Sequence, residues 1–366
     1  MAVSNDLCTD RRVDRHCRAL AEAGFEVVLV GRKLPKSLPV ERPYPTRRLT
    51  LKHLRGWRFY AELNRRLARE LAALRPDIVW ANDTDTLLGC RLAALRRRCP
   101  LVMDAHEFFP EVPELVHKPL VKWVWRSIER LLMPRCDALL TVCDSIAEHY
   151  RHGLGVSMSV VRNLPEGESI KAEEDRSGAK VLLYQGCVNL GRGVDWAIDA
   201  LEWLPQCRLV VAGDGDLLEE MKAYAAAKSW SDRISFTGRL MPDELRALTP
   251  QADVGLVMLE NLGLNYYYAL PNRIGDFVQA GVPMVVSDLP EMSAVVKRFS
   301  VGEVIDQLHG ADGQAKARAL ARAVEKVLAR QWTDADFAAA RRDMDWNKEK
   351  ETLINIANEL CSTTSY

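Results

Sequence analysis

Short apolar runs, each followed by a turn and then an amphipathic helical pattern, recur along the chain and constrain its fold more than any other feature. In the first part of the chain they occupy residues 27–30, 78–81, 101–104 and 138–142. Strands that alternate with helices in this way predict a parallel, doubly wound sheet with helices on both faces. The predicted fold class is therefore α/β.

The same rhythm starts again after the polar stretch 165–178. The later apolar runs occupy residues 181–184, 209–212, 234–236, 254–258 and 284–287. We therefore expect two Rossmann-like domains with a cleft between them, the first over residues 1–165 and the second over residues 170–344. Residues 345–366 have a helical pattern, and this helix can pack on either domain, including back on the first.

The first strand is the one irregular element of the pattern. Only residues 1–3 precede the polar Ser4, Asn5 and Asp6, whereas a strand usually has about five or six residues. Either this strand is very short, or the natural chain begins upstream of Met1.

Composition excludes several classes of protein. Of the 366 residues, 48% are hydrophobic and 27% are charged, unlike a disordered, collagenous or disulfide-knotted chain. The nine cysteines are scattered without zinc or disulfide spacing. No run approaches the roughly 18 apolar residues of a membrane helix, and no apolar core of a signal peptide follows Met1. We therefore expect a cytoplasmic protein.

The net charge of zero hides a division along the chain. Residues 1–165 contain 28 Lys and Arg against 19 Asp and Glu, and residues 166–366 contain 22 against 31. A chain without an overall basic balance is not expected to bind nucleic acid. The two predicted domains instead carry opposite charge.

Two glycine-containing turns follow predicted strands of the second domain. The turn 184–193 places three glycines and Arg192 before a helix that begins near Val194, which predicts an anion site; the alternative is a loop with a solvated arginine. The Gly213-x-Gly215 turn resembles half of a dinucleotide fingerprint. Leu218 occupies the third glycine position, so the turn does not support NAD binding and is equally explained as a tight turn.

The most distinctive segment is 266–283. Pro271 suits the first turn of a helix that runs to about Gln279, and Gly281 and Pro283 end that helix. Asp276, one turn inside, can accept two hydrogen bonds from a ribose diol. Alternatively, it is an exposed helical acid.

His106 and Glu107 directly follow a predicted strand, where ligands of open parallel sheets bind. A histidine there can hydrogen-bond a sugar hydroxyl or the oxygens of a leaving group, and can exchange a proton near neutral pH. The alternative is a structural histidine. No partners at metal-ligand spacing accompany His106, so we expect no metal and no other cofactor.

Together and in this order, these segments resemble the retaining nucleotide-sugar glycosyltransferases of family 4, which have the GT-B fold of two facing Rossmann-like domains. The matching segments, which cover nearly the whole chain, are residues 4–13, 104–114, 186–193, 213–215, 236–240 and 276–283. The resemblance implies that a nucleoside diphosphate sugar binds the second domain without a metal.

The resemblance also implies roles for individual residues. Those near the nucleotide base are Gly238, Arg239 and Leu240. Asp276 binds the ribose, and the diphosphate lies on Arg192 and the backbone N–H groups of Leu270 and Asn272. The turns complete the donor site with Gly186, Asn189, Gly213 and Gly215. His106 and Glu107 lie near the transferred sugar and, with Arg192, are the expected catalytic residues. The acceptor-side residues are Asn5, Asp6 and Arg12.

Three functions remain open. The first is a retaining glycosyltransferase that builds a surface polysaccharide or glycolipid. The second is a non-hydrolysing nucleotide-sugar epimerase, which has the same architecture. The third is a catalytically silent sugar-nucleotide binder or partner subunit, because Tyr268 stands where the family has the first acid of an acid pair and Cys187 stands at an arginine position.

Residues 120–133 form a basic amphipathic pattern with two tryptophans, typical of a helix that lies on a membrane. The alternative is a helix that packs on the first sheet. Further basic clusters, expected on solvated helix faces, lie at residues 47–48, 52–58, 65–66 and 96–98. We therefore predict an anionic or lipid-linked acceptor and peripheral contact with the cytoplasmic face of an anionic membrane.

Overall fold

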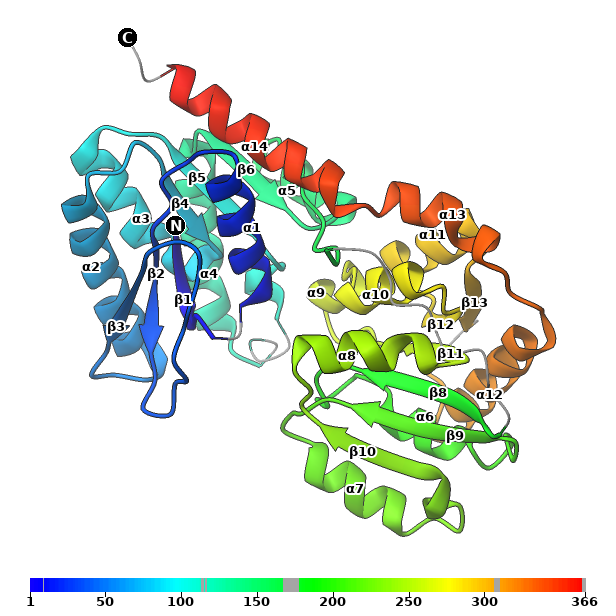
Figure 1. Cartoon of the computed structure of the whole chain (residues 1–366). Coiled ribbons are helices and arrows are strands. Elements are labelled where there is room, and N and C mark those ends of the chain that lie inside the picture. The colour runs from blue at the N-terminus through cyan, green and yellow to red at the C-terminus, as the bar shows by residue number, and fades with distance from the viewer. Residues whose placement is uncertain (9, 113–114, 116, 167–177, 306–309, 364–366) are drawn as a thin grey trace. The chain divides into compact units, whose positions relative to one another are not determined.

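The computed structural model describes residues 1–8, 10–112, 115, 117–166, 178–305 and 310–363 (Figure 1). The chain divides into two compact units: unit 1 comprises Met1–Asn163 and Asn347–Tyr366, and unit 2 comprises Leu164–Trp346. The predicted linker near residue 170 lies outside the described residues. Unit 1 holds 30 Lys and Arg against 22 Asp and Glu, and unit 2 holds 20 against 28, so the division of charge follows the units.

Unit 1 is built on a parallel sheet with the strand order β3-β2-β1-β4-β5-β6-β7. Its strands are β1 Ala2–Asp6, β2 Leu29–Lys33, β3 Thr46–Thr50, β4 Val79–Asn82, β5 Leu101–Ala105, β6 Ala138–Thr141 and β7 Ser159–Val160. Its helices are α1 Arg11–Glu22, α2 Gly56–Leu74, α3 Thr84–Arg97, α4 Pro119–Leu132, α5 Asp144–Leu154 and α14 Trp346–Thr363. Unit 1 therefore has the predicted α/β fold class.

Three strands at the sheet edges, β3 and β7 of unit 1 and β13 of unit 2, were not predicted. Arg47 and Arg48 lie on β3, so their expected place on a solvated helix is wrong. β1 continues through the polar residues Asn5 and Asp6, and it pairs with both β2 and β4. Its length is therefore ordinary, because polar residues complete it.

Helix α14 packs on unit 1. The Glu349 carboxylate accepts hydrogen bonds from the Arg162 backbone N–H (2.7 Å) and from Arg162 Nε (2.8 Å). Leu353 and Ala357 on the same helix are buried. Of the two placements open to this helix, the structure has the one on unit 1.

Unit 2 has a second parallel sheet, with the order β10-β9-β8-β11-β12-β13. Its strands are β8 Lys180–Gln185, β9 Cys207–Ala212, β10 Ile234–Gly238, β11 Val254–Val257, β12 Met284–Ser287 and β13 Gly302–Ile305. Its helices are α6 Val194–Ala200, α7 Leu218–Ala226, α8 Pro242–Leu248, α9 Leu264–Tyr267, α10 Asn272–Ala280, α11 Pro290–Phe299, α12 Gly313–Ala329 and α13 Asp334–Asp343. The two Rossmann-like sheets confirm the predicted fold class.

Each sheet reverses its strand order at one point, between β1 and β4 in unit 1 and between β8 and β11 in unit 2. Ligands of open parallel sheets bind beyond the carboxyl ends of the strands at such a point. These two positions are therefore where functional side chains are expected. No helix among the described residues has the length and apolarity needed to cross a bilayer.

Two loops of unit 2 pack backbone against backbone beside the point at which its strand order reverses. A Cβ atom on Gly213 would lie 1.7 Å from the carbonyl oxygen of Gly186, and one on Gly215 would lie 2.4 Å from the carbonyl oxygen of Val188. The Val188 N–H donates to the Asp214 carbonyl at 3.0 Å. The Gly-x-Gly turn is therefore required by the contact between the loops.

Replacing Gly213 by Ala should destabilise unit 2 by about 3 kcal/mol, because the two backbones must separate to admit one methyl group. Thermal unfolding measures the effect. Gly313→Ala is the matched control, because nothing lies within 4 Å of a Cβ there. An equal melting temperature for the Gly213→Ala and Gly313→Ala proteins would contradict the loop contact.

Candidate functional site

Unit 1 carries a cluster of ionisable side chains beside the carboxyl ends of β4 and β5, which we call the His106 cluster. Arg12 and His16 come from α1, Asp83 follows β4, and Asp104 and His106 lie at the end of β5. They are brought together from distant parts of the sequence.

Asp104 is the centre of this cluster and is completely buried. Arg12 holds it with a two-pronged contact, Nη2 to Oδ1 at 2.7 Å and Nε to Oδ2 at 3.1 Å. Burial disfavours the charged carboxylate, but Arg12 and His106 outweigh burial and hold the pKa of Asp104 well below its usual range. His16 Nδ1 also lies 3.3 Å from Oδ2, and burial lowers the pKa of His16 to about 4.

His106 lies between two carboxylates. Its Nε2 is 3.1 Å from Asp104 Oδ2, its Nδ1 is 3.2 Å from Asp83 Oδ2, and its backbone N–H donates to Asp83 Oδ1 at 2.8 Å. Burial favours the neutral ring, but Asp83 and Asp104 outweigh it and raise the pKa of His106 well above its usual value. The two carboxylates thus favour the protonated, positively charged ring of His106.

Asp83 has a strained backbone, with φ 62° and ψ 162°. For a residue other than glycine, such a conformation is unfavourable in free energy. The residue adopts it only when the surrounding structure imposes it. Here the conformation lets one carboxylate hold both the ring and the backbone N–H of His106. Asp83 is therefore a positioning residue for His106.

The other residues expected in unit 1 have local partners. Arg12 is 4% exposed and also donates to the Val161 carbonyl, so it supports Asp104 from inside and does not face an acceptor. Asp6 accepts from Arg48 Nη2 at 2.7 Å and from the Ser37 hydroxyl. Asn5 Nδ2 donates to the Asp10 carboxylate at 3.3 Å. Glu107 is half-buried immediately after His106.

In unit 2, Gln185 at the end of β8 links two other side chains. Its Nε2 donates to Asp276 Oδ2 at 2.8 Å, and its Oε1 accepts from the Thr249 hydroxyl at 3.0 Å. Gln185 and Thr249 are buried, whereas Asp276 is half-buried one turn inside α10. Asp276 is therefore held in one orientation by buried partners.

Arg273 spans the point at which the strand order of unit 2 reverses. Its Nη1 donates to the Gln185 carbonyl at 2.8 Å, and its Nη2 donates to the Met258 carbonyl at 3.4 Å. The guanidinium also lies over the Tyr184 ring, 4.8 Å from its centroid. With 6% exposure, this buried cation fixes the ends of β8 and β11 to α10.

Arg192, in the turn before α6, is supported from one side. Its Nε donates to the Tyr266 hydroxyl at 3.1 Å, and its guanidinium lies 4.7 Å from the centroid of the Tyr266 ring. Within the described part of the chain, Nη1 and Nη2 make no hydrogen bond. Helix α10 begins at Asn272, and its N-cap residue Pro271 provides no side-chain cap. An arginine and a helix start with donors available suit an anion.

The remaining donor-side residues separate into two groups. Asn189 accepts the Asp216 N–H at 2.9 Å, and with Gly186, Gly213 and Gly215 it builds the packed pair of loops. Gly238 ends the edge strand β10, two strands from β8, with φ +70°. Arg239 after it is exposed and Leu240 is half-buried. The second group therefore lies apart from Asp276 along the sheet.

Sequence reasoning missed Asp83, Asp104, Gln185 and Arg273 as functional supports. Asp83, Asp104 and Gln185 stand at or just after strand ends, so the rule that selected His106 also selects them. Arg273 carries no comparable signal, because its contacts depend on how α10 is placed. The described residues contain no group of His, Cys, Asp and Glu placed to hold a metal ion.

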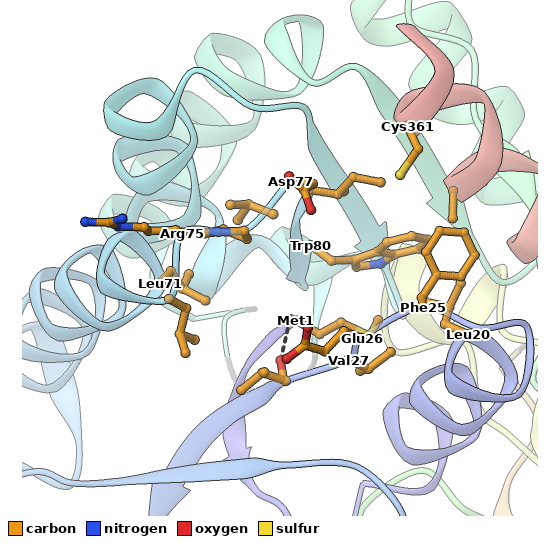
Figure 2. A pocket seen from close by; sticks show the side chains of 16 residues that line it. Met1, Leu20, Phe25, Glu26, Val27, Leu71, Arg75, Asp77, Trp80 and Cys361 are labelled. Carbon is orange, nitrogen blue, oxygen red and sulfur yellow. Dashed lines mark hydrogen bonds between the residues drawn. The ribbon is translucent and has the colours of Figure 1, made fainter. Parts of the chain in front are cut away.

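A cavity of about 240 Å³ lies at the opposite, amino ends of β1, β2 and β4. Figure 2 shows Phe25, Trp80 and Cys361 on its wall. None of the sequence-predicted site residues lines it. This cavity is therefore separate from the candidate site.

Two family models match the chain in succession. The model for Glycosyltransferase Family 4 matches residues 9–167, and the model for group 1 glycosyl transferases matches residues 179–330. The chain is 22% identical over 316 residues to an uncharacterized glycosyltransferase, MJ1607, of Methanocaldococcus jannaschii, with 77% of this chain and 78% of that protein covered. It is 26% identical over 234 residues to the 2-deoxystreptamine glucosyltransferase of Streptomyces kanamyceticus, with 58% of this chain and 56% of that protein covered.

Solved structures show the same fold. A sucrose-phosphate synthase from Thermosynechococcus elongatus matches with a TM-score of 0.77 at 16% identity, covering 96% of this chain and 93% of its own. Anabaena HepE in complex with UDP-glucose matches with a TM-score of 0.72 at 14% identity, covering 98% of each chain. With its two parallel-sheet units and both family matches, the chain belongs to glycosyltransferase family 4 and is a glycosyltransferase with the GT-B fold.

Proposed function

We propose that this glycosyltransferase acts with retention: unit 2 holds a nucleoside diphosphate sugar, and the sugar passes to a glycan or lipid-linked acceptor during synthesis of a surface polysaccharide or glycolipid. One observation carries the proposal. Unit 2 holds the Asp276 carboxylate in one orientation on α10. The start of α10 has no side-chain cap, and it follows shortly after Tyr266, the residue that contacts Arg192.

The chemistry of these groups fits a nucleoside diphosphate. The Asp276 carboxylate accepts hydrogen bonds from the ribose diol, and Gln185 keeps it oriented. The Nη groups of Arg192 and the N–H groups of Leu270 and Asn272 bind the diphosphate, with Gly238, Arg239 and Leu240 at the base. Negative charge that develops on the departing diphosphate is then stabilised by a cation and a helix start. The HepE structure with bound UDP-glucose supports this class of donor.

Unit 1 supplies the acceptor side and a fixed charge. His106, held as an imidazolium by Asp83 and Asp104, provides positive charge near the transferred sugar, with Glu107 beside it. Asn5 and Asp6 contribute to the acceptor side at the end of β1. A preorganised charge stabilises a transition state without having to reorient during the reaction.

We also propose that the acceptor is presented at the surface of an anionic membrane on its cytoplasmic side. The exposed apolar and basic residues of α4 support membrane contact. All nine cysteines are free, as in proteins of a reducing compartment.

The proposal is tested by measuring nucleoside diphosphate release from a panel of nucleotide sugars, with and without glycan and lipid-linked acceptors. We expect acceptor-stimulated release with one donor and an unchanged anomeric configuration in the product. Interconversion of the donor sugar without an acceptor would instead indicate an epimerase, and binding without release would indicate a silent binder.

Arg192→Ala should lower kcat/KM for the donor by roughly 10- to 100-fold, because it removes charge-assisted hydrogen bonds to the diphosphate. Steady-state kinetics and donor titration measure the loss. Arg318→Ala is the matched control, since Arg318 is an exposed arginine of unit 2 that also lies over an aromatic ring. Unchanged donor affinity and turnover in Arg192→Ala would overturn the placement of the diphosphate.

Asp83→Asn should lower the pKa of His106, because it removes one of the two carboxylates that raise it. NMR titration of the His106 ring measures the shift, with the His53 signal as internal reference. The raised pKa stabilises the fold fully below about pH 6.5, the unfolded value, and this contribution is lost as pH rises through the folded value. The difference in the free energy of unfolding between the wild type and Asp83→Asn should therefore be largest at acidic pH and should decrease at basic pH. A His106 titration that is identical in both proteins would contradict the Asp83 contact.

Turnover should be unchanged in EDTA, because the proposal assigns neutralisation of the departing diphosphate to Arg192 and the start of α10. Initial rates with and without the chelator, after removal of adventitious metal, provide the measurement. A loss of turnover that magnesium or manganese restores would refute a metal-independent site.

A further inference from the structure

A groove of about 330 Å³ lies between α4 and α5 in unit 1. Trp123, Arg126 and Arg130 of α4 line one wall, and His149 of α5 lines the other. Phe108, from the segment after β5, also lines the groove and contacts the His149 ring in a tilted arrangement, with 4.4 Å between the ring centroids and 57° between the ring planes. The groove therefore combines cations with aromatic rings.

Positive charge exceeds negative charge along this groove. Glu111 accepts from both Arg126 (2.5 Å) and Lys122 (2.6 Å), so one carboxylate serves two cations. Arg130 is exposed and has no ion-pair partner among the described residues. Glu129, the one acid within α4, is 3% exposed and accepts hydrogen bonds from the hydroxyls of Thr84 and Tyr150. An anion entering the groove thus meets arginine nitrogens without an exposed acid on α4.

Next to the groove, α4 exposes an apolar face. Its side chains are Leu120 (80% exposed), Trp123 (67%), Val124 (46%) and Leu131 (57%), whose spacing places them on one side of the helix. Trp123 belongs both to this face and to the groove wall. A large apolar face beside Arg130, which has no ion-pair partner among the described residues, is unusual on a protein that only meets water.

Helix α3, which packs against α4, also exposes apolar side chains. Leu88, Leu92 and Leu95 are exposed along one side of α3. Arg91, between them in the sequence, donates to the Arg135 carbonyl just beyond α4 at 3.0 Å. The one acid within α3, Asp85, is buried, so the exposed charges of both helices are all positive. Apolar side chains together with charge of one sign match an anionic lipid surface.

We infer that the α3–α4 face docks on an anionic membrane and that the groove between α4 and α5 receives the phosphate of a membrane lipid on Arg126 and Arg130. This inference rests on the proposed function, because the lipid in question is the one that carries the acceptor. Phe108 at the end of the groove stands two residues after His106. We place the sugar attached to this lipid on the His106 side of unit 1.

Flotation with vesicles of phosphatidylcholine alone, and of phosphatidylcholine with phosphatidylglycerol, tests the docking face. At low salt, the whole protein should float with the anionic vesicles and not with the vesicles of phosphatidylcholine alone. Arg130→Gln should weaken this partition about fivefold, the usual contribution of one basic residue at such a surface. Trp123→Ser should weaken it at low and at high salt, because the indole contributes apolar contact.

Matched controls come from α2. Arg65 is an exposed arginine and Trp57 is a tryptophan with 75% exposure, and both lie outside the groove. Arg65→Gln and Trp57→Ser should float like the wild type. Equal losses in the control and groove variants would overturn the assignment of this face.

Arg130→Lys distinguishes a specific phosphate site from non-specific electrostatic attraction to the anionic membrane. Lysine keeps the positive charge but cannot make the two-pronged contact of arginine with phosphate oxygens. We expect it to bind anionic vesicles more weakly than the wild type and to raise KM for a lipid-linked acceptor. Partition equal to that of the wild type would overturn the phosphate site. Diphosphate release with donor alone should be the same in all groove variants, so a loss there would count against the proposed donor site and not against the groove.

Discussion

The buried carboxylate of Asp104 is the interaction on which the arrangement of unit 1 depends. A negative charge with no exposure is tolerated only when opposite charge and hydrogen bonds surround it, since desolvation of an unpaired ion costs several kcal/mol. Arg12 meets this requirement through two hydrogen bonds, and in doing so it fixes the start of α1 against the end of β5. The same carboxylate then holds His106, so one buried charge sets both the packing of a helix and the orientation of the His106 ring.

Unit 2 reaches a comparable rigidity mainly with neutral groups. Gln185 uses its amide to join Thr249 and Asp276, and its backbone carbonyl accepts from Arg273. A neutral amide costs less to bury than an ion, provided that both ends are paired. The amide orients the Asp276 carboxylate, and the outer nitrogens of Arg192 make no hydrogen bond within the described part of the chain. In an acidic unit, the proposed diphosphate site therefore depends on local donors and not on the overall charge of the unit.

The architecture was accessible from the sequence, and much of the site was not. Buried central strands produce apolar runs, so both sheets could be predicted. The edge strand β3 carries Arg47 and Arg48 and has no such run, whereas β7 is only two residues long. The position of Gly213 was recognised, but its reason is a carbonyl oxygen from another loop. Arg12 and Asp104 are 92 residues apart, and no local pattern announces that they meet. His106 could be selected from its place after a strand, but its charge depends on Asp83, which only the folded chain brings to it.

The hydrogen bonds between Arg162 and Glu349, which hold α14 on unit 1, have a consequence for the synthesis of the chain. The two segments of unit 1, Met1–Asn163 and Asn347–Tyr366, lie on either side of unit 2 in the sequence, so unit 2 is inserted near the C-terminal end of unit 1. During synthesis the ribosome releases α14 only after the whole of unit 2 has emerged. The surface of unit 1 that later covers Leu353 and Ala357 stays open during that time. Nascent unit 1 must therefore remain incomplete, and accessible to chaperones, while unit 2 folds beside it.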